Sequence, residues 1–142
     1  MTILIDADGC PVVDITVKTA MRHKIDCIIL CDTAHHFEKP GAKTITVSKG
    51  SDSVDFALVN MVKAGDIVVT QDYGLAAMCL ARRAVPISQN GMIFSDSNID
   101  SLLSERHISK KIRMSGGRLK GQPKRCADQD IAFEKALDEL IS

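Results

Sequence analysis

The sequence predicts an α/β fold in three layers, with helices covering both faces of a mostly parallel sheet. Short apolar runs of strand length alternate along the chain with longer segments whose apolar residues recur at helical spacing. The run at residues 3–5 is apolar throughout, which is typical of a parallel strand buried on both faces. Because 142 residues can bury one continuous core, residues 1–142 are expected to form a single domain.

Local signals place the elements in order. Strands are expected at residues 3–5, 26–31, 44–48, 66–70 and 85–87. Helices are expected at residues 11–23, about 52–65, after residue 72 as far as residue 83, 97 to about 105, and about 128–140. Pro11 suits a first helical position and Ser97 suits an N-cap. Asn90-Gly91 predicts a tight hairpin returning through residues 92–94, an edge that could pair with a second copy in a homodimer.

The charges are balanced overall but unevenly distributed. The chain has 18 basic and 18 acidic residues, so no global field indicates a nucleic-acid or membrane partner. Residues 106–125, however, contain only basic charges, and the segment 106–127 is expected to be mobile within the domain. If this segment binds RNA or DNA, its candidate phosphate contacts are Arg113, Arg118, Lys120, Lys124 and Arg125. A solvated loop with no partner is the alternative.

The cysteines and the hydropathy indicate a compartment. Five scattered cysteines, an odd number, with no secretory signal before them, are typical of free thiols in a reducing cytoplasm. No apolar run approaches the roughly 20 residues that a membrane span needs, so no membrane partner is expected.

Five aspartates are expected at one edge of the predicted sheet. Asp6 and Asp8 follow the first strand, Asp72 follows the strand at 66–70, and Asp52 and Asp55 begin the helix before it. Ligands of open α/β sheets bind beyond the carboxyl ends of the strands, where all five positions meet. Asp66 precedes its strand and is expected at the opposite edge. Helix capping by Asp52 or Asp72 is the structural alternative.

Crowded carboxylates repel one another unless a proton or a cation lies between them. Oxygen-only ligands suit Mg²⁺ or Mn²⁺, as one ion or two, and such ions also bind substrate phosphates. We therefore expect metal-dependent phosphodiester hydrolysis. Asp6 and Asp72 would be direct ligands, while Asp8 and Asp55 would bind through water or orient the attacking water; Asp52 is a further candidate ligand.

Three ordered motifs resemble the bacterial YaiI/YqxD family. They are DADGCP at residues 6–11, GSDSVDFALVNMVKAGDIVVTQDYGLA at 50–76, and KGQPK at 120–124 followed by ADQDIAFEKAL at 127–137. The resemblance covers essentially the whole chain. It implies the PIN-like fold of metal-dependent nucleases, with the family's acidic positions at Asp6, Asp8, Asp52, Asp55 and Asp72.

The chain departs from the family pattern at two places. Gly9 stands where the family usually has Ala. One extra residue near the carboxyl terminus leaves open whether Asp128 or Asp130 matches the family position.

Several other interpretations stay open. A non-catalytic module could bind nucleic acid or protein through the basic segment and keep the acidic site as a relic. The opening Asp-x-Asp-Gly also resembles haloacid-dehalogenase-like phosphatases, although Cys10 replaces the usual Thr or Val, and Asp66 precedes its strand. Cys27 and Cys31 with His35-His36 allow a weak zinc hypothesis, since no second cysteine pair follows. Either histidine could instead contact phosphate or shuttle a proton, and Cys10 has no base placed to activate it.

Overall fold

The computed structural model describes residues 1–33, 38–48, 53–114 and 125–142, with the backbone alone described at 106–114. One five-stranded sheet with the order β3-β2-β1-β4-β5 forms the centre, and every neighbouring pair of strands is parallel. The strands are β1 (Thr2–Asp6), β2 (Asp26–Asp32), β3 (Lys43–Val47), β4 (Ile67–Val69) and β5 (Val85–Ile87). The predicted fold class is confirmed, and each strand lies within two residues of its predicted bounds.

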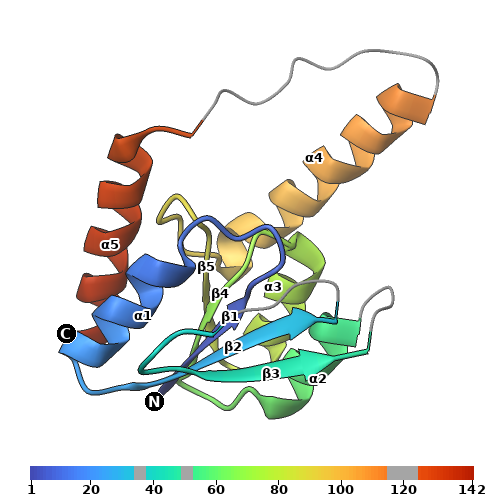
Figure 1. The fold of residues 1–142 in the computed structure, drawn as a ribbon. Helices are drawn as coiled ribbons and strands as arrows, with labels where there is room; N and C mark the ends of the chain where they lie inside the picture. Colours follow the sequence, from blue (N-terminus) through green and yellow to red (C-terminus); the bar gives the residue numbers. More distant parts are fainter. Residues whose placement is uncertain (34–37, 49–52, 115–124) are drawn as a thin grey trace.

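Helices cover both faces of the sheet (Figure 1). They are α1 (Val13–Arg22), α2 (Ser53–Met61), α3 (Tyr73–Ala81), α4 (Asp96–Met114) and α5 (Ala127–Ile141). The side chains of β1 alternate between the faces, as the pleat requires. Ile3 and Ile5 pack in the cluster that contains residues of α1 and α5, whereas Leu4 packs with residues of α2 and α3.

Some helix ends differ from their predicted positions. Pro11 is not the first residue of α1, because Val12 is the N-cap and the helix starts at Val13. The helix α3 ends at Ala81, so Arg82 is its C-cap and Arg83 lies beyond it with a φ of 64°. Ser97 is not an N-cap, since α4 begins at Asp96. That helix continues to Met114, beyond its predicted end at about residue 105. The expected mobility of the segment 106–127 stays a prediction, and residues 115–124 lie outside the described ranges.

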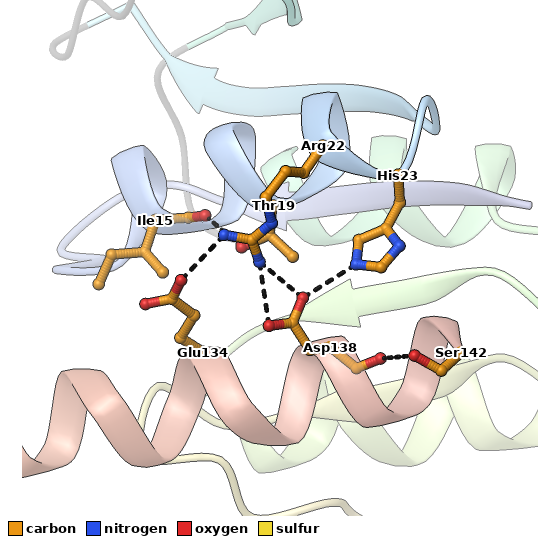
Figure 2. A network of polar contacts seen from close by, with 7 residues as sticks. All are labelled: Ile15, Thr19, Arg22, His23, Glu134, Asp138 and Ser142. Carbon is orange, nitrogen blue, oxygen red and sulfur yellow. Dashed lines mark hydrogen bonds and ion pairs between the residues drawn. The ribbon is translucent and has the colours of Figure 1, made fainter.

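A polar network fixes the carboxyl ends of α1 and α5 to each other (Figure 2). The guanidinium of Arg22 donates to Asp138 at 2.7 Å and to Glu134 at 3.1 Å, and His23 Nε2 lies 2.9 Å from Asp138 Oδ1. Hydrogen bonding to His23 and Arg22 lowers the pKa of the Asp138 carboxyl below its ordinary value. Because these groups are solvent-exposed, the network orients α5 more than it stabilises the fold.

The hairpin predicted after β5 is only partly formed. The returning segment makes one antiparallel bridge, Ile87 with Ile93, and Phe94 N–H donates to the carbonyl of Pro86. The Oγ of Ser88 accepts the backbone N–H groups of Asn90 and Met92, which closes the turn at residues 88–92. The outer side of β5 is therefore partly bonded by its own chain, while pairing with a second copy stays a prediction.

Gly91 to alanine is expected to lower the free energy of unfolding. Gly91 has a φ of 87°, and a Cβ there would lie 2.8 Å from the carbonyl oxygen of Ala132 in α5. Gly65→Ala is the matched control, since Gly65 has a φ of 88° but a Cβ added there would meet no described atom within 4 Å. Strain in φ alone costs about 1–2 kcal/mol, and the contact with α5 should add about 1–3 kcal/mol. Equal losses in urea unfolding of the two variants would contradict the packing argument.

None of the helices in the described part of the chain is both long enough and apolar enough to cross a membrane.

Candidate functional site

The strand order creates a crevice between the carboxyl ends of β1 and β4. From β1 the chain passes through α1 to β2 on one side, whereas from β3 it passes through α2 to β4 on the other side of β1. The order therefore reverses between β1 and β4. Such a switch point is the place where open α/β sheets bind ligands.

A small pocket lies at this switch point, and we call it the acidic pocket. It encloses about 50 Å³, enough for a cation and a few waters but not for a nucleobase. The last residues of β1 and β4 and residues after β1, β4 and β5 line it: Asp6, Asp8, Gly9, Cys10, Val69, Thr70, Gln71 and Gln89. Two of the predicted site residues, Asp6 and Asp8, thus share one pocket.

Asp6 is the central group of this pocket. The pKa of its carboxyl is raised from the ordinary 3.8 to about 6. Burial is the largest cause; a hydrogen bond from Thr70 acts against it, and the neighbouring charges of Asp72 and Asp8 add to it. Thr70 Oγ1 donates to Asp6 Oδ2 at 2.9 Å and accepts the backbone N–H of Asp72 at 3.0 Å. Because its surroundings disfavour the charged form, the Asp6 carboxylate would be stabilised by a cation that replaces its proton.

Asp72 has a structural role as well as its place beside Asp6. Its Oδ1 accepts the backbone N–H of Leu75 at 3.1 Å and so caps α3. The capping interpretation is therefore confirmed for Asp72. Its charge still acts on the carboxyl of Asp6, and one carboxylate oxygen of Asp8, Oδ1, is buried. The charges of Asp72 and Asp8 thus both act on the Asp6 carboxyl.

Asp55 reaches the same side of the sheet from α2. It lies in the first turn of that helix, and both Asp55 and Asp6 raise the pKa of the buried Cys79 thiol, after burial itself. Asp52 lies outside the described residues. Asp66 is at the opposite edge, where its two oxygens accept the backbone N–H groups of Thr2 and Lys63. The prediction that separates Asp66 from the other aspartates is confirmed.

The carboxylate oxygens of the pocket are the type of ligand that a hard divalent cation prefers. The number of protein ligands, however, is small. Among the described residues, no three His, Cys, Asp or Glu side chains are grouped closely enough to hold a metal ion. Mg²⁺ is commonly held by one or two carboxylates together with waters and substrate phosphates. Asp6 and Asp8 could hold an ion in this way. The wider ligand set with Asp52, Asp55 and Asp72 stays a prediction.

The cysteine hypotheses gain no support where the structure describes the residues. Burial raises the pKa of the Cys10 thiol to about 11, which disfavours a nucleophilic thiolate. Cys27 and Cys31 are buried in the core, and burial raises the pKa of Cys27 to about 12. His35 and His36 lie outside the described residues.

Of the predicted basic contacts, only Arg125 has a described side chain. Arg113 belongs to α4 by its backbone, and Arg118, Lys120 and Lys124 lie outside the described ranges. Arg125 Nε donates to Asp130 Oδ1 at 2.8 Å, which gives Asp130 a role beside Arg125. Asp128 is in the exposed first turn of α5.

Thr70 and Gln89 were not singled out from the sequence as residues of the site. Thr70 joins Asp6 to the backbone of Asp72, and Gln89 reaches the pocket from the end of β5. Their positions in the chain could have indicated both residues, because each follows a strand that ends at the same edge of the sheet as β1.

The fold and the site define a class: an α/β protein with coupled carboxylates at the switch point of a parallel sheet. The family profile described as "Uncharacterized BCR, YaiI/YqxD family" matches residues 4–142, so the chain belongs to the YaiI/YqxD family. A "UPF0178 protein" of Exiguobacterium sibiricum is 51% identical over 142 residues, which cover 100% of this chain and 97% of the relative. Another "UPF0178 protein", from Ruminiclostridium cellulolyticum, is 54% identical over 96% of this chain and 90% of the relative.

No solved structure matched the chain significantly. The three-layer α/β arrangement therefore comes from the structure itself, and the PIN-like relationship stays a prediction from the family resemblance.

Proposed function

We propose that the protein is a divalent-cation-dependent phosphodiesterase, a nuclease acting on RNA or DNA. The observation that carries the proposal is the Asp6 carboxyl, which lies in the acidic pocket at the switch point with a pKa raised to about 6. Two further aspartates act on it, and no lysine is among the described residues that line the pocket. A pocket of this composition favours a doubly charged cation over an organic ligand.

Each residue has a definite task in this proposal. Asp6 and Asp8 would hold Mg²⁺ or Mn²⁺, and Thr70 holds the Asp6 carboxylate in place through its hydroxyl. Asp72 and Asp55 would add negative charge and orient water. The cation, when bound, would neutralise a phosphate oxygen and lower the pKa of a bound water.

The relic-site alternative predicts binding without hydrolysis. Asp72 is already used as a helix cap, and a cap alone would explain its position. With added metal, the nuclease interpretation predicts that the substrate is cleaved, whereas the relic-site interpretation predicts that it is bound but not cleaved.

We expect the purified protein to cleave end-labelled single-stranded oligonucleotides in Mn²⁺ or Mg²⁺ and to lose this activity in EDTA. RNA and DNA of one sequence should be tested in parallel, because the 2′-hydroxyl is the chemical difference that separates the two substrates. Gel analysis of the products gives the cleavage pattern. Cleavage that persists in EDTA, or its absence in a preparation that binds Mn²⁺, would contradict the proposal.

A further inference from the structure

Arg125 is held in a fixed position at the turn of residues 88–92. Its Nη1 donates to Asn90 Oδ1 at 2.8 Å, its Nη2 to the carbonyl of Gln89 at 2.7 Å, and its Nε to Asp130. The side chain keeps 20% of its surface exposed. These three bonds use three of the five N–H groups of the guanidinium, and they fix the plane of the other two.

Contacts connect this guanidinium to the acidic pocket. Gln89, whose carbonyl accepts from Arg125, also lines the pocket beside Asp6. The backbone N–H of Gln89 donates to Gln71 Oε1 at 2.8 Å, and Gln71 lines the pocket from the end of β4. The guanidinium of Arg125 therefore lies next to a residue that lines the acidic pocket.

A polyanionic substrate needs such a cation. The coupled carboxylates of the pocket repel phosphate groups, and even a bound divalent ion would offset only part of that charge. Arginine presents a planar set of donors that matches phosphate oxygens, and a guanidinium already held in place loses little side-chain entropy on binding. Joining α5 to the turn does not by itself require a positive charge next to an acidic pocket.

We propose that Arg125 binds a backbone phosphate of a nucleic-acid strand and thereby guides the neighbouring phosphodiester past Gln89 to the acidic pocket. This inference rests on the proposed function, since it names a substrate contact of the same site. It assigns Arg125 to substrate binding, and Asn90, Gln89 and Asp130 to positioning the guanidinium.

Binding can be tested without catalysis. Fluorescence anisotropy of a labelled single-stranded RNA, and of DNA of the same sequence, is measured in EDTA over a range of salt concentrations. We expect Arg125→Met to weaken binding about tenfold at low salt and to reduce the slope of log K against log[salt] by about 0.7, the effect of one lost phosphate contact.

Two matched variants separate charge from folding. Arg82→Met removes an equal charge from the exposed C-cap of α3, which ends away from the acidic pocket, and should leave binding unchanged. Asp130→Asn removes the ion pair but keeps the guanidinium, so it should retain binding within about twofold. Thermal unfolding of all three variants measures how much the bonds of Arg125 to Asn90, Gln89 and Asp130 stabilise the fold.

The outcomes are distinct. The inference is overturned if Arg125→Met binds like Arg82→Met, if Asp130→Asn loses binding together with stability as Arg125→Met does, or if the wild type binds neither oligonucleotide. Arg125-dependent binding by a protein that never cleaves with Mn²⁺ would instead support the inference and contradict the proposed nuclease activity.

Discussion

Asp6→Asn is expected to weaken Mn²⁺ binding by about 100-fold or more, because it removes a negative ligand of the acidic pocket while keeping its shape. Asparagine is nearly isosteric with aspartate, and its Oδ1 can still accept a hydrogen bond from the hydroxyl of Thr70. Cleavage of oligonucleotides should be lost with the metal. Isothermal titration calorimetry with Mn²⁺ at pH 7.5 measures the affinity directly.

The same substitution should stabilise the metal-free protein. The pKa of Asp6 is raised from 3.8 to about 6 in the folded state, so the folded protein binds this proton more tightly than the unfolded chain. The contribution of Asp6 to stability is therefore most favourable below pH 3.8, and it declines as the pH rises to about 6. At neutral pH the ionised carboxyl destabilises the fold by up to about 3 kcal/mol, and asparagine removes this effect.

Asp66→Asn is the matched control for both measurements. It removes a buried aspartate from the opposite edge of the sheet, where both carboxylate oxygens accept backbone N–H groups. An asparagine offers only one acceptor there, so the variant should lose about 1–3 kcal/mol of stability and keep Mn²⁺ affinity. If Asp6→Asn is destabilised like Asp66→Asn and binds Mn²⁺ like the wild type, Asp6 is a structural residue.

The elements of the fold were predictable because their signals are local. The apolar runs at β1 and β4 and the helical spacing of Phe133 and Leu137 in α5 follow from periodicity alone, and the structure buries them as expected. Helix ends were less predictable. The start of α1 at Val13 and the extension of α4 to Met114 had no local signal in the sequence.

The edge of the sheet that carries the acidic pocket was predictable, whereas the hydrogen bonds around the pocket were not. Topology alone places Asp6, Asp55 and Asp72 near one edge, since the carboxyl ends of parallel strands meet there. The hydrogen bond from Thr70 to Asp6 and the contact of Arg125 with Gln89 join residues 64 and 36 positions apart, respectively. Such pairings depend on strand register and on the return of α5, so a single sequence does not reveal them.

Thr70→Val is expected to shift the pH dependence of Mn²⁺ binding upward. A proton competes with the cation for Asp6, so the affinity of the wild type should fall about tenfold per pH unit below about pH 6 and level off above it. The hydroxyl of Thr70 donates to the ionised carboxylate and lowers its pKa. Valine has nearly the same shape but cannot donate, so Asp6 should hold its proton at higher pH, and the affinity at pH 6.5 should fall by about tenfold or more.

Thr70→Ser supplies the control, because serine keeps the hydroxyl that donates to Asp6 and accepts from the backbone of Asp72. Its pH profile should follow the wild type even if the lost methyl lowers stability. The pKa of Asp6 can be followed independently by carboxyl ¹³C NMR, where valine should raise it and serine should not. Coincident profiles for valine and the wild type would mean that Thr70 serves only to fill space between β4 and α3, and that Asp6 owes its position to the backbone alone.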